Sequence, residues 1–130
     1  MAEQFSPEQN DETIFQDAVD ALRRGDRARA KELLTLLLKT DQNNATYWVW
    51  MSASVDNTKE RIYCLQTALQ ADPQNAQCWS TRGLAYERLG DKTKAVGSYA
   101  RALNIRPKDE AARSGFARVG GKPGLNYDAF

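Results

Sequence analysis

Apolar and polar residues alternate along this chain with the period of amphipathic α-helices, separated by short polar or glycine-containing turns. Leu33, Leu34, Leu37 and Leu38 lie at positions i, i+1, i+4 and i+5, so they share one face of a helix. A later helix must end at Arg106, because the residue before a proline disfavours the right-handed helical conformation. The pattern predicts helices throughout and no strands.

The helical pattern repeats. Pro73 and Pro107 are 34 residues apart, and an Ala-Leu pair precedes each proline by the same distance. The best-defined unit, 76–109, predicts one helix from about residue 75 to 89 and a second from 92 to 105, with a Gly-Asp turn between them. A unit of this kind implies neighbouring units that cover its apolar faces.

Two weaker units precede the best-defined one. Trp48 and Trp79 are only 31 residues apart, so the unit 45–75 has a shortened central turn, and its second helix is predicted over about 59–71. Asn57 or Asp56 must cap that helix in the absence of a Gly-Asp pair. The first unit is 11–44, and a single further helix is predicted over 110–119. The segments 1–10 and 120–130 are expected to be flexible.

Unit 76–109 follows the pattern W-x2-L-G-x2-Y, A-x3-F and proline that is typical of a tetratricopeptide repeat. The matching residues are Trp79, Gly83, Tyr86, Ala95, Tyr99 and Pro107. The chain therefore resembles this family over residues 11–119, and departs from its pattern at Arg82, where Leu is usual, and at Tyr99, where Phe is usual. The resemblance implies an all-α fold, a short right-handed solenoid of antiparallel helix pairs with three repeats and a C-terminal capping helix.

The resemblance also implies function. Proteins of this family are non-catalytic interaction modules, and the first helices of their repeats line a concave groove that receives a peptide or helix of a partner protein. Matching positions place ten residues of this chain on that groove: Phe15, Val19, Leu22, Val49, Ala53, Gln77, Ser80, Leu84, Glu87 and Arg88. In the alternative interpretation, the first three of these pack between helices instead of facing a ligand.

Aromatic residues crowd one helix of the second unit. Tyr47, Trp48 and Trp50 lie within four residues, and one helix cannot bury all three toward one partner. Tyr47 and Trp50 are therefore candidate contact anchors, with at least one expected at a seam between repeats or exposed.

One ligand class of the family is not expected. Members that hold the carboxylate terminus of chaperone tails use Lys and Asn on the first helices. The matching positions here are Phe15, Val19, Trp50, Gln77 and Thr81, which cannot clamp a carboxylate.

Charge and composition narrow the possible partners. Hydrophobic residues make up 42% of the chain and charged residues 27%, which favours a folded chain over a disordered one. The formal net charge of +1 gives no case for binding to nucleic acid or to a membrane surface. Its apolar runs are too short for membrane insertion, and its first 20 residues hold six acidic and no basic side chains, which argues against an export signal. A cytoplasmic location is expected.

Charge is also uneven, since residues 82–130 hold ten basic and five acidic side chains. A solvated surface explains this asymmetry most simply. Head-to-tail attraction between acidic and basic ends is the alternative. A homo-oligomer is then possible, and the second functional hypothesis is a structural subunit that self-associates or sits within a larger complex.

The residue types give little basis for catalysis. Histidine is absent, so the serines have no imidazole to activate them, and Cys64 and Cys78 match no metal-binding spacing. We expect no enzyme activity and no cofactor. The two cysteines are expected to be small apolar residues in helix faces, with a disulfide or a reactive thiol as the alternatives. A last possibility is that the aromatic tail 125–130 docks into a groove.

Overall fold

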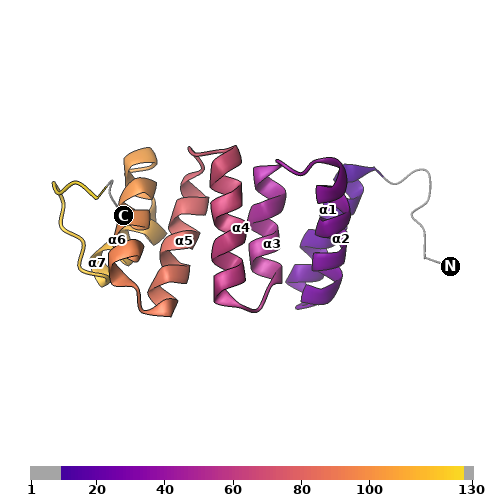
Figure 1. The fold of residues 1–130 in the computed structure, drawn as a ribbon, viewed down its shortest axis with the longest axis horizontal. Helices are drawn as coiled ribbons and strands as arrows, with labels where there is room; N and C mark the ends of the chain where they lie inside the picture. The colour runs from indigo at the N-terminus through magenta and orange to yellow at the C-terminus, as the bar shows by residue number, and fades with distance from the viewer. Residues whose placement is uncertain (1–9, 128–130) are drawn as a thin grey trace.

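The computed structural model describes residues 10–127, and this part of the chain forms seven α-helices without strands. The helices are α1 (Asp11–Arg23), α2 (Arg27–Thr40), α3 (Ala45–Ser54), α4 (Thr58–Ala71), α5 (Ala76–Leu89), α6 (Lys92–Ile105) and α7 (Glu110–Arg118). Consecutive helices are joined by short turns and pack side by side into an elongated array (Figure 1). The predicted all-α solenoid is confirmed, and the bounds of α4 to α7 agree with prediction to within one residue.

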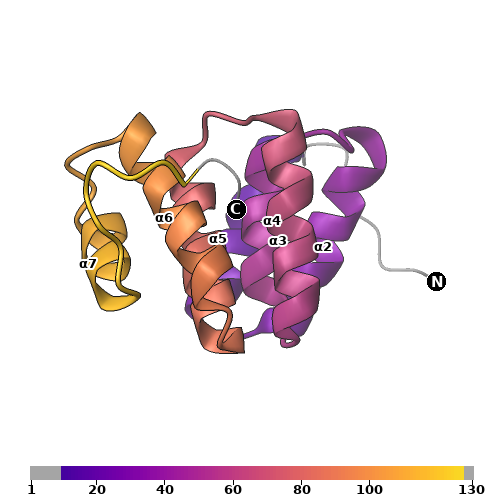
Figure 2. The same ribbon diagram turned by 60° about the vertical axis from the view of Figure 1, so that its left-hand side comes forward.

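The helices form two layers, with α1, α3, α5 and α7 in one layer and α2, α4 and α6 in the other (Figures 1 and 2). Each helix packs against its neighbours in sequence. Within the first layer α1 also contacts α3, and α5 also contacts α7. These direct contacts draw the first layer together, so it forms the inner face of the array.

Each helix begins at an Asn or Asp whose side chain accepts a hydrogen bond from a backbone N–H of the first turn. In the shortened turn of the second repeat this residue is Asn57, which accepts from Lys59 and Glu60 at 2.8 and 3.1 Å. Arg61 closes the preceding helix by donating to the carbonyls of Ser52 and Val55 at 2.9 and 2.8 Å. In this turn without glycine, backbone groups are thus hydrogen-bonded by the side-chain amide of Asn57 and the guanidinium of Arg61.

The close approach of α5, α6 and α7 depends on glycine. Tyr99 of α6 is only 2% exposed, and its ring lies between Gly83 of α5 and Gly115 of α7. A Cβ on Gly83 would lie 2.8 Å from Tyr99 Cδ1, and one on Gly115 would lie 2.2 Å from Tyr99 Cζ. Gly83 thus permits the close packing of α5 against α6, and Gly115 serves the same purpose for α7.

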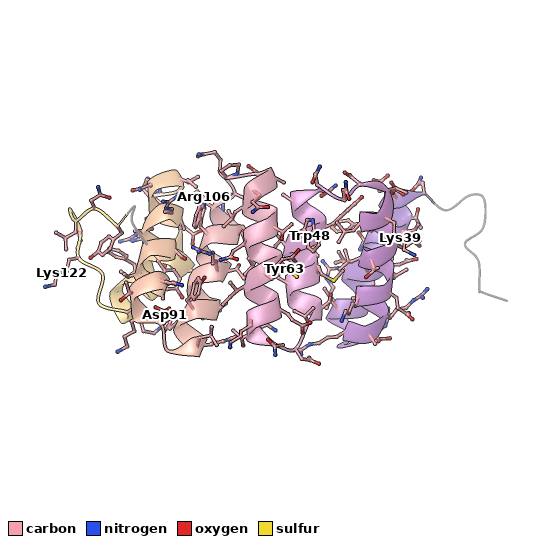
Figure 3. All side chains as sticks on the ribbon, viewed as in Figure 1. Lys39, Trp48, Tyr63, Asp91, Arg106 and Lys122 are labelled. Atoms are coloured by element: carbon pink, nitrogen blue, oxygen red, sulfur yellow. The ribbon has the colours of Figure 1, made fainter. Side chains whose placement is uncertain are left out.

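The two repeat tryptophans tie the inter-repeat turns to the helices. Trp48 Nε1 donates to the carbonyl of Gln42, and Trp79 Nε1 donates to the carbonyl of Pro73, both at 2.8 Å. Tyr63 of α4 packs edge-on against Trp48, with ring centroids 6.3 Å apart (Figure 3).

The two ends of the chain differ. The N-terminal segment predicted to be flexible lies outside the described residues, except for Asn10, which caps α1. Residues 120–127, for which the sequence predicts flexibility, fold back toward α7. The ring centroids of Tyr127 and Phe116 are 5.6 Å apart, and the backbone N–H of Lys122 donates to Tyr127 Oη at 2.9 Å. The contact between the two aromatic rings joins the tail to α7.

Candidate functional site

The inner face carries a depression between α5 and α7, with a volume of about 280 Å³. Tyr99 of α6 lies at its base, with Leu84 on the α5 side. The remaining lining side chains are small, apart from one arginine: Ser80, Thr81, Ala111, Ser114 and Arg118. Two of the predicted groove residues, Ser80 and Leu84, therefore line an actual hollow.

The α7 side of this depression was missed by the sequence analysis, although the sequence contains the signal. Ala111, Ser114 and Arg118 lie one repeat length after Gln77, Ser80 and Leu84. Residues at equivalent repeat positions face the same way, so α7 continues the inner face as a further first helix would. The resemblance to the repeat family predicts α7 only as a capping helix.

A three-residue network closes one end of the depression. Glu87 accepts hydrogen bonds from Tyr99 Oη at 2.8 Å and from Arg118 Nη2 at 3.0 Å. The hydrogen bond from Arg118, supported by that from Tyr99, holds the pKa of the Glu87 carboxyl below its ordinary value. Burial, together with the nearby Glu87 carboxylate, raises the pKa of Tyr99 to about 12.

This network joins α5, α6 and α7, and it uses hydrogen-bond acceptors of the Glu87 carboxylate. The carboxylate was predicted to face a ligand, but its hydrogen bonds are already made to Tyr99 and Arg118. Gln77 and Arg88, by contrast, are exposed on α5.

On the N-terminal part of the inner face, predicted groove residues pack against other side chains of the same chain. Val19 is only 5% exposed, so its prediction as a groove residue is corrected: it packs in the interior. Phe15 is partly buried against Tyr47 and Trp50 of α3, at centroid distances of 5.4 and 6.0 Å. Phe15 thus packs between helices, the alternative that the sequence analysis had left open.

The remaining groove candidates on α1 and α3 differ in their exposure to solvent. Leu22 and Val49 are partly buried, and Val49 packs against the cluster of Leu65, Ala68, Leu69 and Cys78. Ala53 is exposed.

Tyr47 and Trp50 lie at the seam between the first two repeats. Both are partly buried against Phe15, so neither projects freely as an exposed anchor. Within residues 10–127, the exposed aromatic side chain is instead Tyr63, whose exposed fraction is 63%. It lies on α4, a second helix of a repeat, which the groove pattern did not consider.

Both cysteines are free and buried. Burial raises the pKa of the Cys64 thiol to about 11 and that of Cys78 to about 12. Thiols that stay protonated at neutral pH are weak nucleophiles. Both cysteines lie in helices as small apolar side chains, as predicted, and the disulfide alternative is not observed between them.

Two features of residues 10–127 bear on the kinds of partner. Among these residues no three His, Cys, Asp or Glu side chains gather where they could hold a metal ion. None of the helices there has both the length and the apolar character needed to cross a lipid bilayer.

Comparison with known proteins decides the family. The tetratricopeptide repeat model matches residues 76–109, which coincide with the third predicted repeat. The chain is a tetratricopeptide repeat protein. Mouse Superkiller complex protein 3 is 30% identical over 109 residues, which covers 79% of this chain and 7% of that protein.

Solved structures share the solenoid. The first tetratricopeptide repeat domain of Spaghetti (RPAP3), bound to an HSP90 peptide, superposes with a TM-score of 0.80 at 15% identity, over 84% of this chain and 91% of that one. The second such domain of human RPAP3, in complex with an HSP70 peptide, gives 0.77 at 18% identity, over 87% of this chain and all of that one. At these identities the likeness shows the fold alone.

Proposed function

We propose that this tetratricopeptide repeat protein is a non-catalytic adaptor that binds a peptide or helix of a partner protein on its inner face. The depression between α5 and α7 supports the proposal. Small side chains at Ser80, Ala111 and Ser114 leave room there, while Leu84 and Tyr99 offer apolar contact.

The repeat domains of RPAP3 that share this fold are bound to peptides, which supports a peptide as the kind of ligand. The sequence differs from a carboxylate clamp, however, since Gln77 and Thr81 stand at two of the positions that would hold Lys or Asn. We therefore propose an internal segment with an apolar side chain, rather than a chaperone-type acidic terminus, as the occupant.

Leu84→Arg tests the proposal. The larger charged side chain should fill the depression and reduce partner binding at least tenfold, because a hydrophobic pocket loses an anchor and gains a desolvated charge (about 1.4 kcal/mol for each factor of ten). Tagged wild-type and variant proteins would be compared in a pull-down from the native source, with mass spectrometry.

Leu89→Arg is the matched control, because Leu89 is 45% exposed on the same helix and does not line the depression. Circular dichroism of each variant confirms that its helices are intact. A partner retained by Leu89→Arg and lost by Leu84→Arg supports the proposal. Equal recovery of all partners by both variants excludes the depression as the binding site.

A structural role is the second candidate. The relative whose name describes a complex subunit supports it, and the chain spans only 7% of that protein's length. A largely apolar depression of about 490 Å³ is lined by residues of α6, α7 and the tail. Light scattering at about 100 μM protein in low salt, where charges are least screened, would detect self-association. A monomer under these conditions excludes a self-assembling subunit.

A cytoplasmic location also stays a prediction. Fluorescence microscopy of the tagged chain in its native source tests it, and accumulation in a membrane-bound compartment would contradict it.

A further inference from the structure

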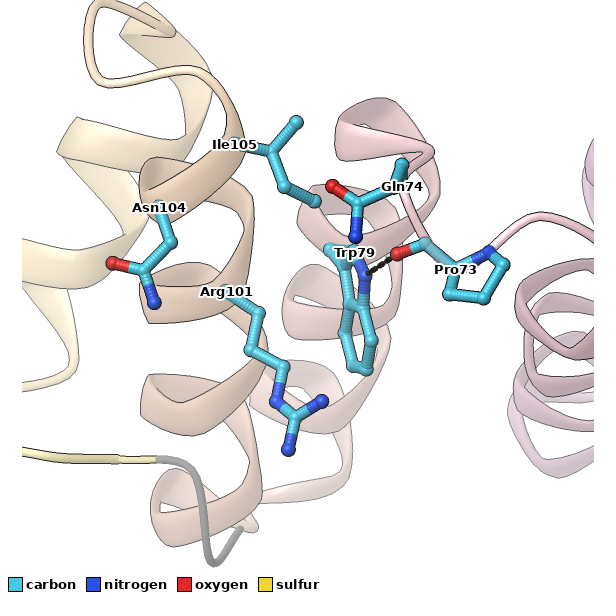
Figure 4. A pocket seen from close by; sticks show the side chains of 6 residues that line it. All are labelled: Pro73, Gln74, Trp79, Arg101, Asn104 and Ile105. Carbon is cyan, nitrogen blue, oxygen red and sulfur yellow. Dashed lines mark hydrogen bonds between the residues drawn. The ribbon is translucent and has the colours of Figure 1, made fainter.

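A second surface lies on the other side of α5, between the outer helices α4 and α6. Trp79, Arg82 and Tyr86 follow at helical spacing and share this face of α5. Two adjoining depressions share Trp79. One, of about 410 Å³, is lined by Pro73, Gln74, Trp79, Arg101, Asn104 and Ile105 (Figure 4). The other, of about 320 Å³, is lined by Gln66, Leu69, Gln70, Trp79 and Arg82.

Cations and aromatic rings alternate along this surface. The guanidinium carbon of Arg101 lies 4.9 Å from the centroid of Trp79, and that of Arg82 lies 5.3 Å from the same ring. Arg82 is also 4.9 Å from the centroid of Tyr86, whose ring lies 5.6 Å from Lys94 Nζ. Stacking on ring faces orients a guanidinium while its N–H edge remains able to donate.

Arg82 is the central cation of this surface. In the part of the chain that the structure describes, no Asp or Glu lines either depression. Arg82 is partly buried and donates to Ser98 Oγ at 2.9 Å, and its Nε is buried without a hydrogen-bond partner. Among the described residues Arg82 has no carboxylate partner. A partly desolvated cation without a counter-charge is costly, so an anionic ligand would be stabilised there.

We propose that this surface between α4 and α6 binds an acidic segment of a partner protein. Carboxylates of the segment would accept from Arg82 and Arg101, and apolar side chains would contact the ring of Trp79. The side-chain amides of Gln70, Gln74 and Asn104 could hydrogen-bond its backbone. A peptide fits better than a nucleic acid, because the formal net charge is only +1 and would not attract a long polyanion. This surface is separate from the depression on the inner face.

The test is a fluorescence-anisotropy titration with a fluorescein-labelled peptide in which Glu alternates with Ala. Saturable binding is expected, and Arg82→Leu and Arg101→Gln should each weaken it about tenfold, as loss of a charge-assisted hydrogen bond would. Arg82→Leu restores the side chain usual at this repeat position. Should that variant not fold, Arg101→Gln on α6 carries the test alone.

Two controls locate the site. Arg24→Gln removes the same charge from an exposed position at the far end of the chain, and it should change affinity by less than about twofold. In ¹H–¹⁵N spectra, the indole resonance of Trp79 should shift on addition of peptide, while that of Trp50 should not.

Three results would overturn the proposal. The first is the absence of saturable binding up to about 1 mM peptide. The second is equal binding of a peptide with Gln in place of Glu, or equal loss of affinity in Arg24→Gln. The third is tighter binding of a single-stranded RNA oligonucleotide, which would assign the surface to phosphodiesters.

Discussion

Tyr99 links α5, α6 and α7, which the repeat pattern alone does not indicate. Its ring fills the space between two glycines of α5 and α7, and its hydroxyl donates to Glu87. The family pattern has Phe at this position, which could fill the same space but could not make this hydrogen bond. A single added oxygen atom thus couples the packing of α6 to the polar network that holds α7.

Gly115→Ala should destabilise the fold. The new Cβ would lie 2.2 Å from Tyr99 Cζ, so the ring or α7 must shift, at a cost of about 1–3 kcal/mol for overpacking. The higher helix propensity of Ala offsets at most about 1 kcal/mol. Thermal unfolding of this variant beside Ser114→Ala, an exposed position on the same helix, measures the effect. A melting temperature above that of wild type would contradict the packing described here.

From the burial of the two thiols, we expect the free energy of unfolding to fall at alkaline pH. In the unfolded chain they ionise near their ordinary pKa of 9.0, whereas in the fold Cys64 and Cys78 hold their protons to about 11 and about 12. Because the pKa values of both thiols are higher in the folded state, their contribution to the free energy of unfolding is complete below pH 9. It is lost as the pH rises toward 12.

Guanidinium chloride unfolding at several pH values measures this dependence. The double variant Cys64→Ala/Cys78→Ala should lose less stability than wild type over the same range. Parallel curves for the two proteins would mean that the thiols ionise as readily in the fold as outside it.

At the scale of helices, α7 belongs to the inner face as well as covering the last repeat. Its contacts reach α5 and α6, and its repeat positions continue those of α5. The last turn of α7 is anchored through Arg118 to Glu87, a residue 31 positions earlier. The depression between α5 and α7 therefore depends on this anchor.

Acid should release α7 before the rest of the fold. Glu87 has a folded pKa below its ordinary 4.5, so its contribution is present above pH 4.5 and is lost as pH falls through the lowered value. Amide hydrogen exchange of α7 at decreasing pH is expected to show loss of protection there first. Glu87→Gln should show this low protection already at pH 7, whereas Glu110→Gln, an exposed acid of α7, should resemble wild type.

At the scale of the whole molecule, the C-terminal flank is the surface on which a further repeat would pack. The tail covers part of it, with Tyr127 against Phe116 and with Leu125 near Ala100 and Leu103. Leu125 itself remains 59% exposed, so the cover is incomplete.

Deleting residues 121–130 should increase binding of a hydrophobic dye and promote self-association, because Phe116 and Leu103 lose their cover. Sedimentation velocity at several concentrations measures association, with a deletion of residues 1–9 as the control for shortening. Unchanged dye binding and an unchanged association state would mean that the tail does not protect this flank.

The amino-acid sequence by itself determined the helices, their caps and the repeat register. These features depend on neighbours within a few positions: apolar spacing marks each helix face, and Asn or Asp marks each start, including Asn57 in the shortened turn. A repeat makes such local signals recur, so the solenoid follows from them.

Only the tertiary structure decided which of the inner-face residues remain available. Val19 is buried and Phe15 is partly buried because α1 and α3 pack against one another, while the Glu87 carboxylate is hydrogen-bonded to Arg118 of α7. Likewise, the charge of Arg82 lies beside the rings of Trp79 and Tyr86, and Arg101 of the next helix contacts the same Trp79 ring. Burial and pairing of this kind join residues far apart in the chain, and they depend on distances that a repeat period does not contain.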